Sequence, residues 1–70
     1  MNLGVWRHYK GGLYLVLGVA KHTESGEELV VYVPLYELPG AGLPLQARPR
    51  RMWEEPVDGK PRFVFQGEQR

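Results

Sequence analysis

The residues best suited to chemistry are cationic or aromatic, and they lie in a few short stretches. Arg7, His8, Tyr9 and Lys10 form an uninterrupted run near the start of the sequence. Guanidinium and protonated imidazole groups are hydrogen-bond donors that need acceptors, and aromatic rings supply flat apolar surfaces. Gathered on one face, such groups would bind an anionic ligand. The predicted binding residues are Arg7, His8, Tyr9, Lys10, His22, Glu24, Tyr32 and Arg48.

The two histidines, His8 and His22, offer a metal site together with Glu24. A hairpin turn at Gly11–Gly12 would place His8 opposite Leu15. Seven residues of extended strand, about 23 Å, then separate that point from His22, and only strong barrel curvature would shorten the gap. We therefore predict no metal ligands, and expect each imidazole to be a hydrogen-bonding residue of a strand.

The most specific expectation concerns a polar cluster. It is that Arg7, His8, His22 and Arg48 lie near one another and bind anions, because their side chains are donors seeking acceptors. By the strand geometry, a cluster of Arg7 or His8 with Arg48 needs less curvature than one that includes His22.

Aromatic residues are numerous and alternate with basic ones. On an exposed sheet such residues stack bases and hold phosphates. Strands also select aromatic residues for packing alone, and the net charge of +1 is low for a dedicated nucleic-acid binder. Packing is thus favoured for most rings. Nucleic acid stays open as a partner, beside a peptide or an anionic small molecule.

No known catalytic spacing occurs in the sequence. There is no cysteine, nucleophile elbow, phosphate-binding loop or zinc-protease histidine pair. No catalytic residue and no cofactor are predicted, and a binding module with a polar and aromatic groove is favoured over an enzyme. A small hydrolase or metal-dependent enzyme built on His8, His22 and Glu24 is the alternative, and a structural subunit that forms a homodimer is a third.

Turn-forming residues divide the chain into short β-like runs. Gly11–Gly12 predicts a two-residue hairpin turn, residues 23–26 a second turn and Asp58–Gly59 a third. Pro56 ends a single helical turn over 50–55, and residues 37–44 form a loop. The predicted strands are 5–10, 13–22, 27–36, 45–48 and 62–66.

Residues 13–19 are apolar at nearly every position. This pattern is typical of a strand covered on both faces, or of a long strand that bends between the sheets of a small barrel, with Gly18 marking the bend. A helix is the rival there, but no N-cap precedes it. The predicted fold class is all-β, a five-stranded SH3-like, partly open barrel with one short helical turn. An OB-type barrel or a meander with one helix is the alternative.

The predicted core contains Tyr14, Val16 and Val31 with Phe63 or Phe65. A hairpin around Ser25–Gly26 would bring the second strand beside the third. Truncating Val31 to Ala is then expected to cost about 1–3 kcal/mol.

Length and composition predict one domain, residues 1–70, with a thin core. The longest apolar stretch, 13–20, is too short to span a membrane, and cations interrupt any signal-like segment. With no cysteine present, the expected location is the cytoplasm. Residues 1–22 hold bases and no acid, residues 23–45 hold four glutamates and no base, and three arginines then precede Glu54, Glu55 and Asp58. Basic and acidic patches or complementary faces are therefore expected.

An ordered string of motifs runs through roughly residues 4–65. It comprises Trp6-Arg7-His8-Tyr9-Lys10-Gly11-Gly12-x-Tyr14, Gly18-Val19-Ala20-Lys21-His22-x-Glu24, Val30-Val31-Tyr32, Leu35-Tyr36 and Arg48-Pro49-x-x-Met52. The string resembles a family of short bacterial proteins, domain-of-unknown-function family 1653. The resemblance implies a small β domain and brings no established activity or catalytic residue. Members usually have Tyr, Trp and Phe where this chain has Trp6, Gln46 and Trp53.

Overall fold

The computed structural model describes residues 1–36 and 45–67, so the predicted loop at 37–44 lies outside them. One antiparallel sheet of five strands accounts for most of this part, in the order β4-β3-β2-β1-β5. No pairing joins the edge strands β4 and β5 within the described residues, so the sheet is not closed. The predicted all-β, partly open fold is confirmed. The elements are β1 (Gly4–His8), β2 (Leu13–Lys21), β3 (Glu28–Pro34), β4 (Gln46–Pro49), α1 (Arg50–Glu54) and β5 (Phe63–Gly67).

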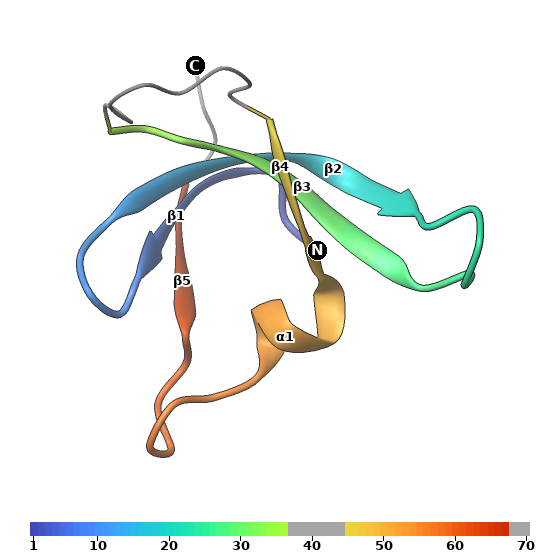
Figure 1. The fold of residues 1–70 in the computed structure, drawn as a ribbon. Helices are drawn as coiled ribbons and strands as arrows, with labels where there is room; N and C mark the ends of the chain where they lie inside the picture. Colours follow the sequence, from blue (N-terminus) through green and yellow to red (C-terminus); the bar gives the residue numbers. More distant parts are fainter. Residues whose placement is uncertain (37–44, 68–70) are drawn as a thin grey trace.

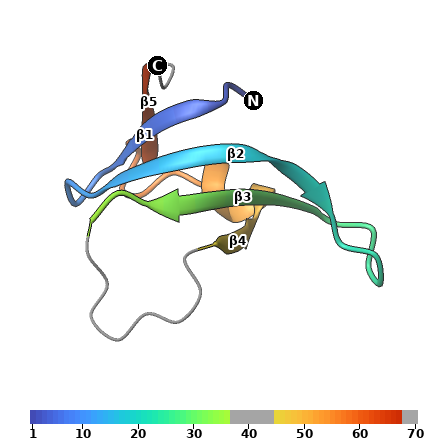
Figure 2. The same cartoon turned by 90° about the horizontal axis from the view of Figure 1, so that it is seen from above.

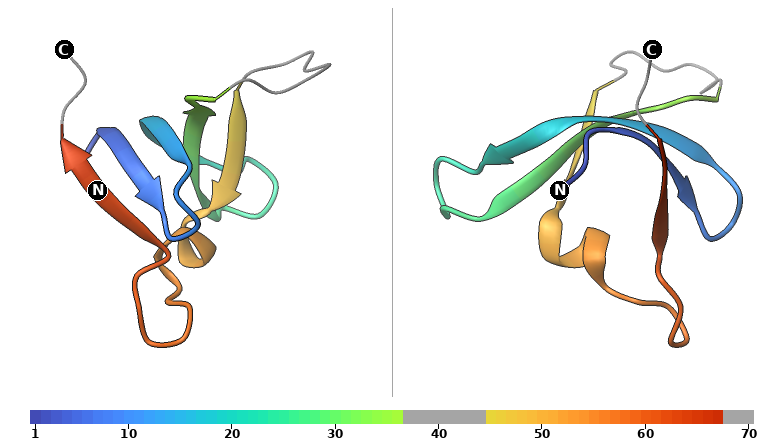
Figure 3. Two further views of the ribbon diagram at one scale, coloured as in Figure 1. Left: turned by 90° about the vertical axis from the view of Figure 1, so that its left-hand side faces the viewer. Right: turned by 180° about the vertical axis from the view of Figure 1, so that it is seen from behind.

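The sheet is arched, and the helix α1 lies beneath its concave face (Figure 1). Seen from above, β5 and β1 lie toward one side and β3 and β4 toward the other, with α1 under the sheet (Figure 2). The succession from β5 to β4 is plainest from the side (Figure 3). Among residues 1–36 and 45–67, no helix is long and apolar enough to cross a membrane.

The β1–β2 hairpin differs from the prediction. His8 donates its N–H to Gly12 O at 2.7 Å, and Gly11 donates to His8 O at 2.7 Å, so the loop holds three residues instead of two. Arg7 therefore pairs with Leu13 and not with Val16. A two-residue type I′ turn needs positive φ at both central residues. Here Gly11 has a φ of +102° and Gly12 is not among the positive-φ residues.

Two other turns form at the residues that the sequence predicts, 58–59 and 23–26. Asp58 and Gly59 have φ values of 51° and 78°, and the bridge Val57↔Lys60 closes the two-residue turn that the Asp-Gly pair predicts. At residues 23–26, Gly26 donates to His22 O at 2.7 Å and has a φ of +77°. Both predicted turns are confirmed.

A bulge in β2 sets which side chains reach the concave face. Val16 pairs with Tyr32, but Gly18 pairs with Val31, so the register shifts by one residue between them. Because strand side chains alternate, the inward positions change parity at this point. The shift lies beside Gly18, where the sequence predicted a bend.

The core lies between the concave face and α1. Its buried residues are Val16, Val30, Tyr32, Trp53 and Phe63, with Trp6 and Tyr14 packed against them. The prediction is correct for Tyr14, Val16 and Phe63 and wrong for Val31, which is only half-buried because Val30 and Tyr32 face inward. Trp53 was not predicted. Its indole Nε1 is buried without a hydrogen-bond partner among residues 1–36 and 45–67, and the ring packs against other aromatic rings.

The acidic and basic blocks of the sequence meet as complementary faces. Arg50 lies 3.5 Å from Glu28, and Arg51 lies 3.1 Å from Glu27. These pairs are partly exposed, so each contributes at most about 1 kcal/mol. Their effect is to fix α1 beside the start of β3.

The core assignment predicts unequal costs for two neighbouring valines. Val30→Ala is expected to lower the free energy of unfolding by about 2–3 kcal/mol, because the side chain is fully buried. Val31→Ala, on the other face of β3, is expected to cost less than about 1 kcal/mol. Urea denaturation of both variants measures the difference, and equal costs would contradict the assignment.

Candidate anion-binding site

Four side chains gather at one end of the concave face. His8 ends β1 and pairs directly with Phe63, the first residue of β5. Their rings meet edge to face with centroids 4.9 Å apart, and the Tyr14 ring from β2 lies 5.7 Å from Phe63. Arg48 joins them from β4. The guanidinium carbon of Arg48 lies 5.6 Å from the centroid of the Phe63 ring. Because β4 and β5 are the two edge strands, this contact crosses the open side of the sheet.

Arg48 differs from the other described arginines in its hydrogen bonding. Each of the others donates to a carbonyl or a carboxylate of the protein: Arg7 to Gly11 O, Arg50 to Glu28 and Glu54, Arg51 to Glu27, and Arg62 to Glu55. Within residues 1–36 and 45–67, Arg48 has no such acceptor, although it is half-buried. A guanidinium carries five N–H donors. With respect to the described residues, its donors are therefore available to a ligand.

The charges that act on His8 are all cationic. Burial lowers the pKa of the His8 imidazole, and the nearby Arg48, Arg62 and Lys10 lower it further. The Lys10 backbone N–H donates to its Nδ1 at 3.1 Å. The neutral ring is therefore favoured when the site holds no anion, and the local potential is positive.

Two tyrosines border the same end of the face. The hydroxyls of Tyr14 and Tyr36 are 3.1 Å apart, within hydrogen-bond distance. Burial raises the pKa of Tyr14 to about 12, and the hydrogen bond to Tyr36 adds to the effect. Gly12 lies beside both rings, and a Cβ there would meet the Tyr36 ring at 3.4 Å, an ordinary van der Waals contact. Tyr36 was not among the predicted binding residues, because its partner Tyr14 lies 22 residues away in the sequence.

The predicted site residues divide into two groups. His8 and Arg48 come together, with Tyr9 and Lys10 adjacent in the exposed hairpin loop, where the Tyr9 and His8 rings are 4.4 Å apart. Tyr32 is only 5% exposed and belongs to the core beneath.

The remaining three lie elsewhere. Arg7 occupies the opposite face of β1 from His8, because adjacent strand residues alternate. His22 and Glu24 lie beyond the far end of β2, where His22 Nδ1 accepts the Glu24 N–H at 3.1 Å and so stabilises the turn. The expected cluster of four is therefore wrong for Arg7 and His22. In the part of the chain that the structure describes, no group of three acidic, histidine or cysteine residues can hold a metal ion.

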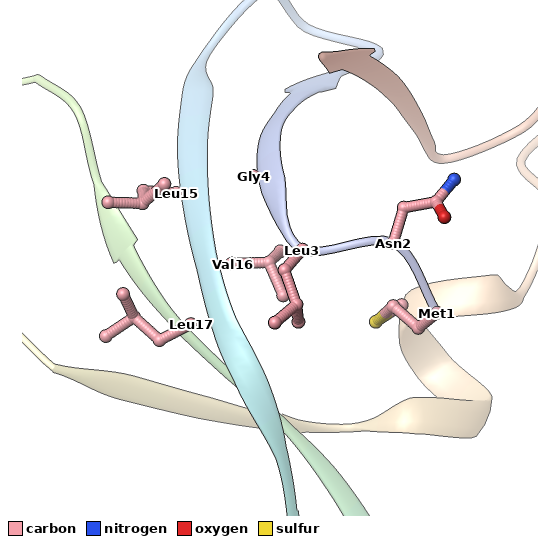
Figure 4. A pocket seen from close by; sticks show the side chains of 7 residues that line it. All are labelled: Met1, Asn2, Leu3, Gly4, Leu15, Val16 and Leu17. Atoms are coloured by element: carbon pink, nitrogen blue, oxygen red, sulfur yellow. The ribbon is translucent and has the colours of Figure 1, made fainter. Parts of the chain in front are cut away.

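A separate shallow hollow of about 570 Å³ lies beside β1 and β2 (Figure 4). Leu15 and Leu17 point to one side of β2 and Val16 to the other. The hollow is lined by Met1, Asn2, Leu3, Gly4, Leu15, Val16 and Leu17. None of these side chains titrates, so this hollow offers no acid–base chemistry.

Comparison with known proteins gives the family. The model described as "Protein of unknown function (DUF1653)" matches residues 4–65. The chain belongs to this family. The crystal structure of a DUF1653 protein from Bordetella bronchiseptica is 44% identical, covering 100% of this chain and 92% of that one, with a TM-score of 0.88. No curated protein matches. The resemblance predicted from the motifs is confirmed, and the DUF1653 fold is the arched sheet described above.

The surroundings of His8 predict a pH dependence of stability. Its pKa is lowered in the folded state, so the unfolded chain binds more protons as the pH falls through about 6.5. His8 therefore lowers the free energy of unfolding as the pH falls below about 6.5. Above neutral pH, His8 has no such effect on the free energy of unfolding. His8→Gln should flatten this part of the pH profile measured by urea denaturation. A wild-type profile that is unchanged in the variant would contradict the assignment.

Proposed function

We propose that this DUF1653 protein is a binding module whose ligand carries an anionic group held by Arg48. The observation that supports the proposal is the half-buried guanidinium of Arg48, which has no protein acceptor among residues 1–36 and 45–67. A phosphate or a carboxylate accepts two parallel hydrogen bonds from such a group.

His8 gives the proposed site a pH response. The cations Arg48, Arg62 and Lys10 all disfavour its protonated form, and a bound anion offsets their field. Binding therefore raises the pKa of His8, and affinity increases as the pH falls. Arg62 contributes mainly through its field, because its guanidinium already lies 3.6 Å from a Glu55 carboxylate oxygen.

The geometry supports binding better than catalysis. The Tyr14 hydroxyl, with its pKa raised to about 12, is a weak acid that stays protonated near neutral pH. His22 and Glu24, which a hydrolase would have to combine with His8, lie at the other end of β2. The described part of the site offers donors and rings, and these bind ligands.

The proposal is tested by titrating inorganic phosphate and following the His8 ring by NMR at low salt. Wild type and Arg7→Gln should bind alike, since Arg7 lies on the opposite face of β1. Arg48→Gln should weaken binding by about 10- to 100-fold, the loss of hydrogen bonds to a charged group. A dispersed spectrum confirms that each variant is folded.

Two results would contradict the proposal. One is a His8 signal that does not move at millimolar phosphate. The other is an equal loss of affinity in Arg7→Gln and Arg48→Gln, which would indicate attraction to the net charge alone.

A further inference from the structure

Four aromatic rings cross the end of the concave face in an unbroken row, here called the ring row: Tyr9, His8, Tyr14 and Tyr36. Successive ring centroids are 4.4, 6.3 and 5.7 Å apart. The two ends of the row are exposed, Tyr9 by 49% and Tyr36 by 47%. The inner two, His8 and Tyr14, are half-buried against Phe63. The two outer rings of the row are thus exposed aromatic surfaces, and the two inner rings pack against the core.

Cations accompany the ring row, and the carboxylates of the described ion pairs are bonded to other arginines. Lys10 Nζ lies 5.7 Å from the Tyr9 centroid, and Arg48 lies over Phe63 beside the middle of the row. Glu27, Glu28 and Glu54 pair with arginines of α1. The row therefore combines exposed rings with two cations whose charge is not neutralised by those carboxylates.

We infer that the anionic ligand is single-stranded nucleic acid, with bases stacked on Tyr9 and Tyr36 and a phosphate bound by Arg48. This inference rests on the proposed anion site. Every base has a face that stacks on an aromatic ring, and cations beside such rings bind the phosphates that link successive bases. A duplex hides its base faces and would leave both exposed tyrosines without stacking partners. Because the contacts are stacking and phosphate contacts, the site should show little sequence preference.

The inference is tested with fluorescein-labelled octamers of uridine and of thymidine, by fluorescence anisotropy. Both should bind more tightly than inorganic phosphate, and more tightly than a duplex of equal length. Tyr9→Leu and Tyr36→Leu should each weaken octamer binding by about 5- to 100-fold, the loss of one stacking contact. Tyr9→Phe keeps the ring and should bind as wild type. With Arg48 and Lys10 each contacting a phosphate, the logarithm of the affinity should fall against the logarithm of the salt concentration with a slope of about −1.4.

The controls separate this inference from the proposed function. Phosphate binding that depends on Arg48, with octamers no tighter than phosphate and indifferent to Tyr9 and Tyr36, would overturn the inference and leave the anion site intact. If neither phosphate nor the octamers lose affinity in Arg48→Gln, both the inference and the proposed function are overturned. An oligo-glutamate peptide that binds more tightly than the octamers, and loses affinity in Tyr9→Leu, would overturn it in favour of a peptide.

Discussion

The stacking of Trp53 on Phe63 is the contact on which the rest of the structure depends. The two rings are nearly parallel, 3° apart, with centroids at 3.7 Å. Trp53 also contacts Trp6 of β1 and Tyr32 of β3, so one side chain joins distant parts of the arch. A buried tryptophan removes roughly 150–250 Å² from water, an upper contribution on the order of 5 kcal/mol. That is a large share of the 5–15 kcal/mol typical of a whole domain.

The same contact explains why a five-residue helix is present at all. α1 has no side-chain N-cap hydrogen bond, and helices this short are not stable in isolation. Burial of Trp53, at 2% exposure, holds it in place. An open sheet needs its concave face covered, and α1 covers it where a closed barrel would use its own far strands.

The candidate site follows from this packing. With Phe63 fixed against Trp53, strand pairing holds His8 opposite it, and Arg48 reaches the same ring from the other edge of the sheet. The site is therefore built on strand residues, which position side chains more exactly than loops do. The exposed tyrosines adjoin these residues: Tyr9 contacts His8, and the Tyr36 hydroxyl lies 3.1 Å from that of Tyr14.

The sequence predicted features that local chemistry decides. Asp58–Gly59 forms its turn and Gly18 its bulge because backbone geometry at those residues depends on their immediate neighbours. The predicted two-residue turn at Gly11–Gly12 was wrong, because the loop holds three residues and only Gly11 of the two glycines has a positive φ. Val31 was chosen over Val30 because a single-residue bulge reverses which side chains face inward. Arg48 was predicted by residue type, but its lack of an acceptor within residues 1–36 and 45–67 emerges only from the placement of the described arginines and their acceptors.

The central claim is that Arg48, alone among the arginines of residues 1–36 and 45–67, has no protein acceptor there and binds an anion. The most direct measurement is NMR of the arginine side-chain Nε–Hε signals, with and without inorganic phosphate. The Arg48 signal should shift on titration, whereas those of Arg50 and Arg51, already bonded to Glu54 and Glu27 through Nε, should stay in place. An Arg48 signal that stays fixed, or shifts no more than those of Arg50 and Arg51, would contradict the account.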